Sequence, residues 1–138
     1  MKLQMSPPTI AVILPCFNEA LAVRQVLDEF KEHLPAAALH VFDNRSTDDT
    51  ARVARDAGAK VTHVQLRGKG NVVRRMFADV EADVYVMVDG DATYDVSSIQ
   101  RHVDLLLDNG LDMVVGYRQD DGLNPQTYRP GHRWGNQL

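Results

Sequence analysis

Hydrophobic residues follow two alternating patterns along the chain. The first is a short run rich in β-branched residues, bounded on both sides by polar or turn-forming residues. These runs are Ile10–Leu14, Leu39–Phe42, Lys60–Leu66, Val84–Val88 and Met113–Val115. Short bounded apolar runs are typical of strands in a sheet that is covered on both faces. The sequence therefore predicts five buried strands.

The second pattern lies between the runs, where apolar residues recur at the spacing of one helical face. The predicted faces are Val23, Val26, Leu27, Phe30 and Leu34; Thr50, Val53, Ala54 and Ala57; Val73, Met76, Phe77 and Val80; and Ile99, Val103, Leu106 and Leu107. Each face repeats for about two turns or more, so four helices are predicted.

Residues that favour helix ends stand near the expected boundaries. Asn18 and Ser46 precede the first and second helices and are good N-caps. Gly58 and Gly110 follow the second and fourth helices, where a left-handed residue often ends a helix. Strands that alternate with helices imply a mostly parallel central sheet with helices on both faces, a three-layer α/β/α domain.

The alternation covers only part of the chain. It begins after a tail of residues 1–8, fills residues 9–118, and gives way to a polar stretch over residues 119–138 that is predicted to be loop. The length of 138 residues, with 44% hydrophobic and 25% charged residues, fits one globular domain.

Composition narrows the functional classes. A net charge of −4 argues against a general nucleic-acid binder. The single cysteine, Cys16, excludes an intramolecular disulfide, and its apolar neighbours predict that it is buried. There is no signal-peptide pattern and no apolar run near the roughly 20 residues of a spanning helix. We expect a cytoplasmic chain, which could meet a membrane only through segments absent from this sequence.

The predicted architecture indicates where a ligand binds. In open α/β sheets the site lies beyond the carboxyl ends of the strands. The segments at those ends are Pro15–Glu19, Asp43–Asp49, Arg67–Gly70, Asp89–Asp95 and Gly116–Arg118.

Asp89 and Asp91, separated by Gly90, directly follow a predicted buried strand. Charge at such a place is costly unless it is paired or bound to a cation. Two carboxylates suit Mg²⁺ or Mn²⁺, which usually add substrate phosphates and water to one or two protein ligands. Asp-Gly is also common turn chemistry, so an ordinary strand-end turn is the alternative.

Other candidates lie at the same predicted edge. Asp43 follows the second strand and precedes the helix cap, a position where a base or ribose hydrogen bond would explain it. Lys69 stands between Gly68 and Gly70 at a helix start, where it could face phosphate or belong to a flexible turn. The five histidines have no metal-ligand spacing and are predicted to be structural or surface residues.

Taken in order, these segments resemble glycosyltransferase family 2, whose fold is the Rossmann-like GT-A fold. The resemblance rests on Ala11–Glu19, Asp43–Asp48, Gly68–Gly70 and Asp89–Asp91. Gly116-Tyr117-Arg118 and His132–Asn136 look like the dolichyl-phosphate mannose synthase branch and its bacterial polyprenyl-phosphate relatives. The similarity runs from about Thr9 to Leu138.

The resemblance implies a role for each matching residue. Pro15, Phe17 and Glu19 match a stretch that lines the nucleoside pocket, with Phe17 in place of the usual tyrosine. Asp43 matches the first acid of an Asp-Asp-x-Ser pair that contacts base or ribose, and Asn44 replaces the second acid. Lys69 matches a basic position near the donor, and Asp89 and Asp91 match the metal-binding Asp-x-Asp motif. Arg118 and Arg133 match arginines that approach the donor and acceptor phosphates.

The implied activity is inverting transfer of a sugar from a UDP- or GDP-linked donor, with Mg²⁺ or Mn²⁺ on the diphosphate. The implied acceptor is either a polyprenyl phosphate at the membrane surface, which needs no catalytic base, or a hydroxyl group. A hydroxyl acceptor would need a carboxylate base, which family members place beyond the residues of this sequence. No nucleic acid is expected to bind, and no protein partner is inferred.

Two other functions stay open at this stage. Relatives continue past the Gly-Asn sequence with acceptor-side helices, so the chain is expected to be an incomplete catalytic unit or a naturally short protein. A nucleotide-sugar-binding module, or a truncated remnant, without turnover is the first alternative. A sugar nucleotidyltransferase is the second, although the glycine-rich signature of that class is absent after the first strand.

Overall fold

The computed structural model describes residues 5–117, in which strands and helices alternate. The strands are β1 (Ile10–Cys16), β2 (Ala38–Asp43), β3 (Lys60–His63) and β4 (Val84–Met87), and the helices are α1 (Val23–His33), α2 (Thr50–Asp56), α3 (Lys69–Asp79) and α4 (Ile99–Asp108). The chain divides into two compact units, residues 1–92 and 93–138. The first unit contains the whole sheet, and the second contains α4.

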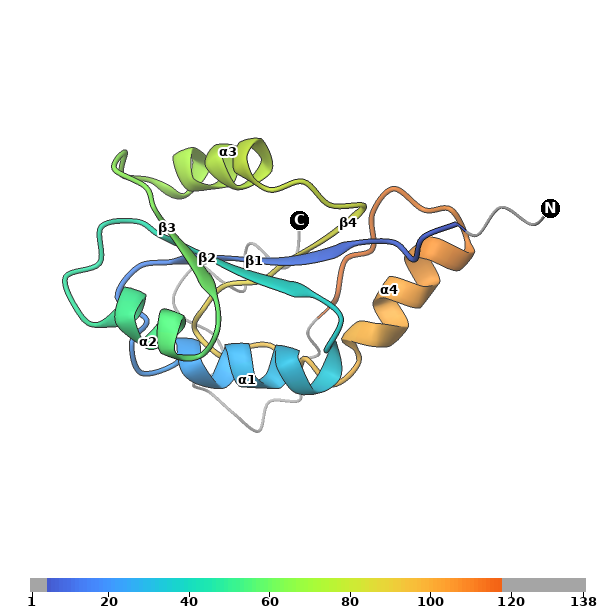
Figure 1. Ribbon diagram of the computed structural model, residues 1–138, viewed down its shortest axis with the longest axis horizontal. Helices are drawn as coiled ribbons and strands as arrows, with labels where there is room; N and C mark the ends of the chain where they lie inside the picture. The colour runs from blue at the N-terminus through green and yellow to red at the C-terminus, as the bar shows by residue number, and fades with distance from the viewer. Residues whose placement is uncertain (1–4, 118–138) are drawn as a thin grey trace. The chain divides into compact units, whose positions relative to one another are not determined.

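The sheet is parallel throughout, with strand order β3-β2-β1-β4. Within the first unit, α3 lies on one face of the sheet and α1 and α2 lie on the other (Figure 1). β1 pairs with β2 on one side and β4 on the other, and its residues Val12, Ile13 and Leu14 have no solvent exposure. The expected three-layer arrangement around a parallel sheet is therefore confirmed, and its most apolar strand is central.

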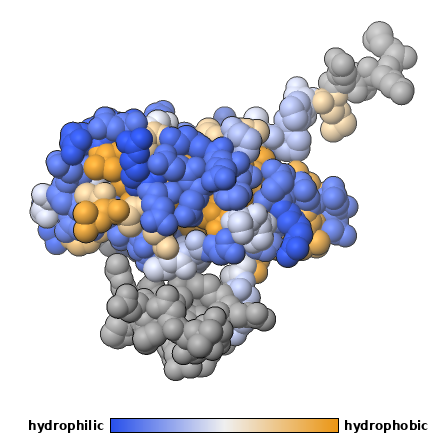
Figure 2. Space-filling view, turned by 90° about the horizontal axis from the view of Figure 1, so that it is seen from below, coloured by the Kyte–Doolittle hydropathy of each residue, from blue (hydrophilic) through white to orange (hydrophobic). Residues whose placement is uncertain are grey.

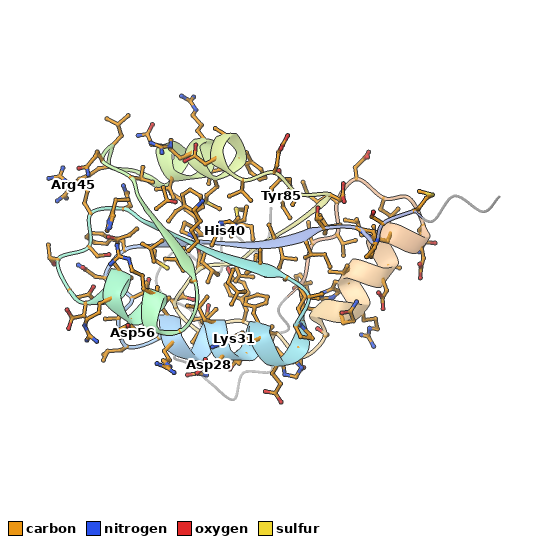
Figure 3. The ribbon with its side chains drawn as sticks, in the orientation of Figure 1. Asp28, Lys31, His40, Arg45, Asp56 and Tyr85 are labelled. Atoms are coloured by element: carbon orange, nitrogen blue, oxygen red, sulfur yellow. The ribbon has the colours of Figure 1, made fainter. Side chains whose placement is uncertain are left out.

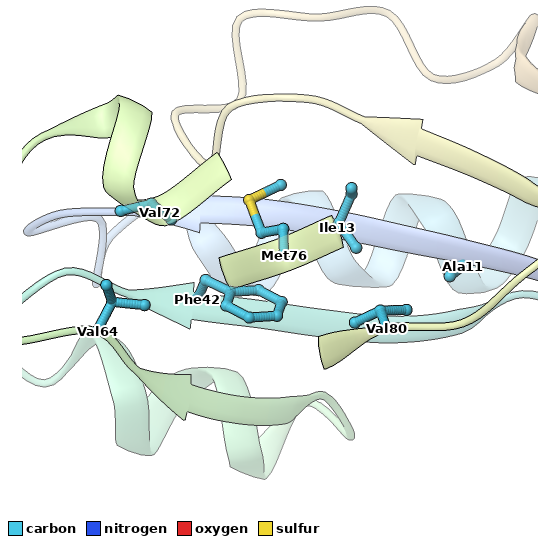
Figure 4. Close-up of a cluster of buried hydrophobic side chains, with 7 residues drawn as sticks. All are labelled: Ala11, Ile13, Phe42, Val64, Val72, Met76 and Val80. Carbon is cyan, nitrogen blue, oxygen red and sulfur yellow. The ribbon is translucent and has the colours of Figure 1, made fainter. Parts of the chain in front are cut away.

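The face of the sheet beneath α3 holds a compact apolar cluster (Figure 4). Its members are Ala11, Ile13, Phe42, Val64, Val72, Met76 and Val80. Alternate residues of β1 point to opposite faces, so Ala11 and Ile13 contribute here while Val12 and Leu14 point toward α1 and α2. Burying a side chain such as Phe42 or Met76 stabilises the fold by about 1.5–3 kcal/mol.

The apolar stripe predicted for α1 is confirmed, since Val23, Val26, Leu27, Phe30 and Leu34 are all at most 3% exposed. The other side of α1 is polar, and the outer surface seen from this side is mostly hydrophilic (Figure 2). Lys31 and Asp28 lie together on α1 with their charged atoms 3.0 Å apart (Figure 3). Lys31 Nζ also donates to the Ala57 carbonyl at 2.8 Å, which ties α1 to the end of α2.

The buried face of α3 differs by one position from the predicted face. Val72 and Met76 are buried, whereas Val73 is only partly buried and Phe77 is 50% exposed. The row at positions i, i+4 and i+8, from Val72 through Met76 to Val80, is the one that contacts the sheet. Phe77 instead packs edge-on against the Tyr85 ring, with centroids 5.2 Å apart.

The two predicted N-caps are wrong. Helix α1 begins after Ala22 and α2 begins after Asp49, and neither has a side-chain cap. Asn18 and Ser46 bond to each other's loops, because the Asn18 N–H donates to Ser46 Oγ and Asn18 Oδ1 accepts from the Thr47 N–H. These long-range bonds take up the polar groups that the sequence alone assigns to local capping.

The two predicted C-terminal glycines are confirmed. Gly58 has φ of +95° and Gly110 has φ of +59°. After α2, the Gly58 N–H donates to the Arg55 carbonyl and the Ala59 N–H donates to the Ala54 carbonyl. After α4, Gly110 and Leu111 donate in the same way to Leu107 and Leu106. This is the Schellman arrangement that ends helices with a left-handed residue.

Replacing Gly58 with alanine is expected to lower the free energy of unfolding by about 1 kcal/mol, because a Cβ is strained at this positive φ. No atom lies within 4 Å of the added Cβ, so crowding does not contribute. Gly70→Ala is the matched control, since its site is equally open and lies inside α3, where alanine should be neutral or stabilising. Urea denaturation checks both variants, and equal effects at the two positions would contradict the assignment.

Two strand predictions need correction. Met113–Val115 forms no strand within residues 5–117, and Met113 and Val115 are at least 75% exposed. Three apolar residues are insufficient without a neighbouring strand to pair with. β3 ends at His63 rather than Leu66, because the carbonyls of Val64 and Leu66 accept hydrogen bonds from the Asn44 side chain and not from a strand.

Among the described residues, no helix has both the length and the apolar character needed to cross a bilayer.

Candidate functional site

Polar residues gather at the carboxyl edge of the sheet, where β1 and β4 are neighbours. The chain leaves β1 toward β2 and β3 on one side and returns to β4 on the other. This change of direction is a topological switch point, the usual place for a ligand in open α/β sheets. β1 ends at Cys16, β2 ends at Asp43, and Asp89 follows β4 by two residues.

Gly90 packs directly against the end of β1. A Cβ built on Gly90 would lie 2.5 Å from Cys16 Sγ and 3.6 Å from Glu19 Cγ. The φ of Gly90 is not positive, so the need for glycine comes from space and not from backbone conformation. The close approach of these two segments brings Asp89 and Asp91 beside the loop that follows β1.

The pKa of the Cys16 thiol depends on the charges around it. It is 2% exposed, and burial raises its pKa far above the ordinary value, with the negative charges of Glu19, Asp43, Asp89 and Asp91 raising it further. Carboxylates from the ends of three strands therefore act on one point. Their combined field favours a cation at this edge.

Lys69 supplies one cation. Its Nζ lies 2.6 Å from Asp89 Oδ1, and its side chain is 62% exposed whereas that of Asp89 is 27% exposed. Lys69 is the first residue of α3, and it follows Gly68, whose φ of +113° favours glycine. The predicted basic residue thus reaches the predicted acidic motif across the edge of the sheet.

The donor set at Asp89 and Asp91 fits a metal ion that is shared with a substrate. Within residues 5–117, no three His, Cys, Asp or Glu side chains are arranged to hold an ion by themselves. Mg²⁺ and related ions that work on phosphates need only one or two carboxylates, because phosphate oxygens and water complete the shell. Two half-buried acids beside an open edge meet that requirement.

Asp43 is a buried acid with partners inside the protein. It is 4% exposed, its Oδ1 accepts from the Ser46 N–H at 3.3 Å, and its Oδ2 lies 3.2 Å from His63 Nδ1. His63 was not among the predicted site residues, although the register places it opposite Asp43 at the end of the neighbouring strand. Matching the ends of β2 and β3 would have identified the pair.

Asn44 bonds to the loop between β3 and α3. Its side-chain amide donates to the carbonyls of Val64 at 3.1 Å and Leu66 at 2.8 Å, and its Oδ1 accepts from the Gly68 N–H at 3.1 Å. The backbone N–H of Asn44 donates to the Cys16 carbonyl at 2.9 Å. Asn44 thus joins the ends of β1 and β2 to the loop that precedes Lys69.

The loop after β1 presents the remaining predicted residues. Pro15 is half-buried within β1, Phe17 is 51% exposed, and Glu19 is half-buried. The Glu19 N–H donates to Thr50 Oγ1 at 2.9 Å, which fixes this loop to the start of α2. Phe17 therefore offers an aromatic face on a loop that is held at several points.

The structure thus brings eight predicted residues to one edge of the sheet. They are Pro15, Phe17, Glu19, Asp43, Asn44, Lys69, Asp89 and Asp91. Arg118 and Arg133 lie outside the described residues. The burial of Cys16 follows from its apolar neighbours and is confirmed, whereas its contact with Gly90 was not predicted, because contacts between segments far apart in the sequence leave no local pattern.

Comparison with known proteins shows which family this chain is similar to. The model of the family described as "Glycosyl transferase family 2" matches residues 11–138. Protein RfbJ of Shigella flexneri is 60% identical over 124 residues, which cover 90% of this chain and 95% of that protein. A dolichyl-phosphate hexose transferase of Haloferax volcanii is 30% identical over 125 residues, which cover 89% of this chain and 54% of that protein.

A solved structure has a similar fold. It is glucosyl-3-phosphoglycerate synthase from Mycobacterium tuberculosis in complex with Mn²⁺, uridine diphosphate and glucosyl-3-phosphoglycerate. The TM-score is 0.64 at 30% identity, over 72% of this chain and 39% of that one. The predicted GT-A fold is therefore confirmed, and the chain spans about two fifths of that enzyme.

Proposed function

Because the chain belongs to glycosyltransferase family 2, we propose that it is an inverting glycosyltransferase whose donor is a nucleotide-diphosphate sugar. The observation that carries this proposal is the position of Asp89-Gly90-Asp91 at the switch point, packed on the end of β1 and paired with Lys69. A diphosphate with its cation would complete the charge balance there. Family membership favours glycosyl transfer over nucleotidyl transfer.

We assign the nucleoside end of the donor to the loops after β1 and β2. Phe17 is half-exposed and would stack on the base, with Pro15 and Glu19 shaping the same wall. Asp43 would accept a hydrogen bond from the base or ribose after modest rearrangement of its bond to Ser46. An aromatic ring and a carboxylate would thus recognise the nucleoside, and this recognition needs no positively charged surface.

The diphosphate end belongs with Asp89, Asp91 and Lys69. The two acids would hold Mg²⁺ or Mn²⁺, and Lys69 would neutralise a phosphate oxygen. The cation supplies Lewis-acid stabilisation of the departing diphosphate, worth several kcal/mol. Arg118 and Arg133 are assigned to the donor and acceptor phosphates through the family resemblance alone.

The proposed acceptor is a polyprenyl phosphate at a membrane surface. An acceptor phosphate oxygen would form the new bond to the anomeric carbon from the face opposite the diphosphate, as the bond to the diphosphate breaks. The nucleophile is already anionic, so no side chain has to remove a proton. This is consistent with the similarity to a dolichyl-phosphate hexose transferase, although that name describes the relative and not this chain.

A second candidate is a donor-binding module without turnover. It needs only the donor-site residues at the carboxyl edge of the sheet, and eight of these lie within the described residues. The two candidates share the donor site and differ only in what happens after binding.

Calorimetric titration tests the donor site that both candidates need. UDP-glucose and GDP-mannose are titrated with Mn²⁺ and with EDTA. We expect one of them to bind at least about tenfold more tightly with Mn²⁺, a difference of about 1.4 kcal/mol. Equal affinity in both conditions, or no binding of either donor, would contradict the proposal. Release of UDP or GDP on addition of a polyprenyl phosphate then separates the enzyme from the module.

A further inference from the structure

The side chain of Asn44 has no amide hydrogen left for a ligand. An asparagine amide has two N–H donors, and here one donates to Val64 and the other to Leu66. Its oxygen accepts from the Gly68 N–H. Three bonds from one side chain therefore hold the loop of residues 64–68, which has no strand partner of its own at Leu66.

The same loop determines where Lys69 stands. Gly68 has φ of +113°, a conformation open mainly to glycine, so the backbone is permissive just before the helix begins. Lys69 follows directly, and its Nζ lies 2.6 Å from Asp89 Oδ1. A permissive backbone needs an external restraint to place a long side chain reproducibly, and Asn44 provides three bonds to the preceding residues.

We infer that Asn44 is a positioning residue that acts through Lys69, rather than a residue that contacts the nucleotide. It holds the loop between β3 and α3 so that Lys69 meets Asp89 and, by the proposed function, the donor diphosphate. The inference rests on that function only for its last step. The placement of Lys69 beside Asp89 is a property of the protein without ligand.

The chemistry of the position explains why it is asparagine. A carboxylate accepts hydrogen bonds and donates none. Aspartate at position 44 would keep the bond from Gly68 but would set a negative oxygen against the carbonyls of Val64 and Leu66. The family's second acid is therefore incompatible with this loop arrangement, and the replacement changes the role of the position.

The first test uses the protein without nucleotide. Backbone amide resonances are compared among wild type, Asn44→Asp, Asn44→Ala and Lys69→Met. We expect both Asn44 variants to shift the Asp89 and Gly90 amides in the same direction as Lys69→Met. Gln65→Glu is the control, because it adds the same charge to an exposed residue of the same loop. Unmoved Asp89 and Gly90 amides in Asn44→Asp would overturn the inference.

The second test is a double-mutant cycle on UDP binding in the presence of Mn²⁺. Asn44→Asp is expected to weaken binding about tenfold in the wild-type background and less than about twofold when Lys69 is already methionine. Equal losses in both backgrounds would mean that Asn44 acts by direct contact or by general destabilisation, which contradicts the inference. Should the wild type fail to bind UDP while the amide shifts appear as expected, the proposed function fails and the positioning role stands.

Discussion

Replacing Asp91 with asparagine is expected to lower Mn²⁺-dependent binding of the nucleotide sugar, and any sugar transfer, by about 100-fold or more. In the proposed site the cation would contribute several kcal/mol, and each 1.4 kcal/mol corresponds to tenfold. Asparagine keeps the size of the side chain but removes the charge that would face the proposed ion. Metal titration followed by calorimetry measures the effect directly.

Asp112→Asn is the matched control for Asp91→Asn. Asp112 is exposed and lies outside the segments at the carboxyl edge of the sheet, so the same change of charge should leave donor binding within about twofold. If Asp91→Asn binds the donor as tightly as the wild type in the presence of Mn²⁺, Asp91 is not a metal ligand. Thermal unfolding of both variants separates a lost ligand from a lost fold.

Replacing Gly90 with alanine is expected to lower the free energy of unfolding by about 1–3 kcal/mol, the usual cost of overpacking. The new methyl group would lie 2.5 Å from Cys16 Sγ, which is too short for a carbon and a sulfur atom that are not bonded to each other. Either the Cys16 side chain or the segment that carries Asp89 and Asp91 must then shift, so Mn²⁺-dependent donor binding should weaken as well. Urea denaturation and calorimetry measure the two effects.

A second substitution shows whether crowding is the cause. Cys16→Ala removes the sulfur that the new methyl group meets, while Glu19 stays at an ordinary contact distance. The double variant should therefore regain most of the stability lost in Gly90→Ala, relative to Cys16→Ala alone. Simple addition of the two losses would mean that the glycine is needed for some other reason.

Much of the fold could be predicted from the sequence because its signals are local. The stripe of α1, the four paired strands and the glycines after α2 and α4 each depend on residues a few positions apart. The predictions that failed depend on distant partners. Asn18 and Ser46 cap no helix because each bonds to the other's loop, and Phe77 leaves the core because Tyr85 offers its ring a contact.

The same distinction between local signals and distant contacts applies to the candidate site. The strand-end rule and the family resemblance together selected residues that do gather at one edge of the sheet. They could not indicate that His63 pairs with Asp43, or that Gly90 fits against Cys16, since these contacts join segments 20 and more residues apart. The role of Asn44 was equally hidden, because two of its three side-chain bonds end on Val64 and Leu66, which the sequence assigned to a strand.

The proposed function requires that Asp89 and Asp91 bind a divalent cation that in turn binds the diphosphate of the donor. The most direct measurement is a crystal structure of the protein with Mn²⁺ and UDP, with anomalous data collected at the manganese edge. We expect one anomalous peak within coordination distance of an Asp89 or Asp91 carboxylate, with oxygens of both phosphates completing its shell. UDP bound at this edge without manganese, or manganese bound elsewhere while both carboxylates keep to protein partners, would contradict the account.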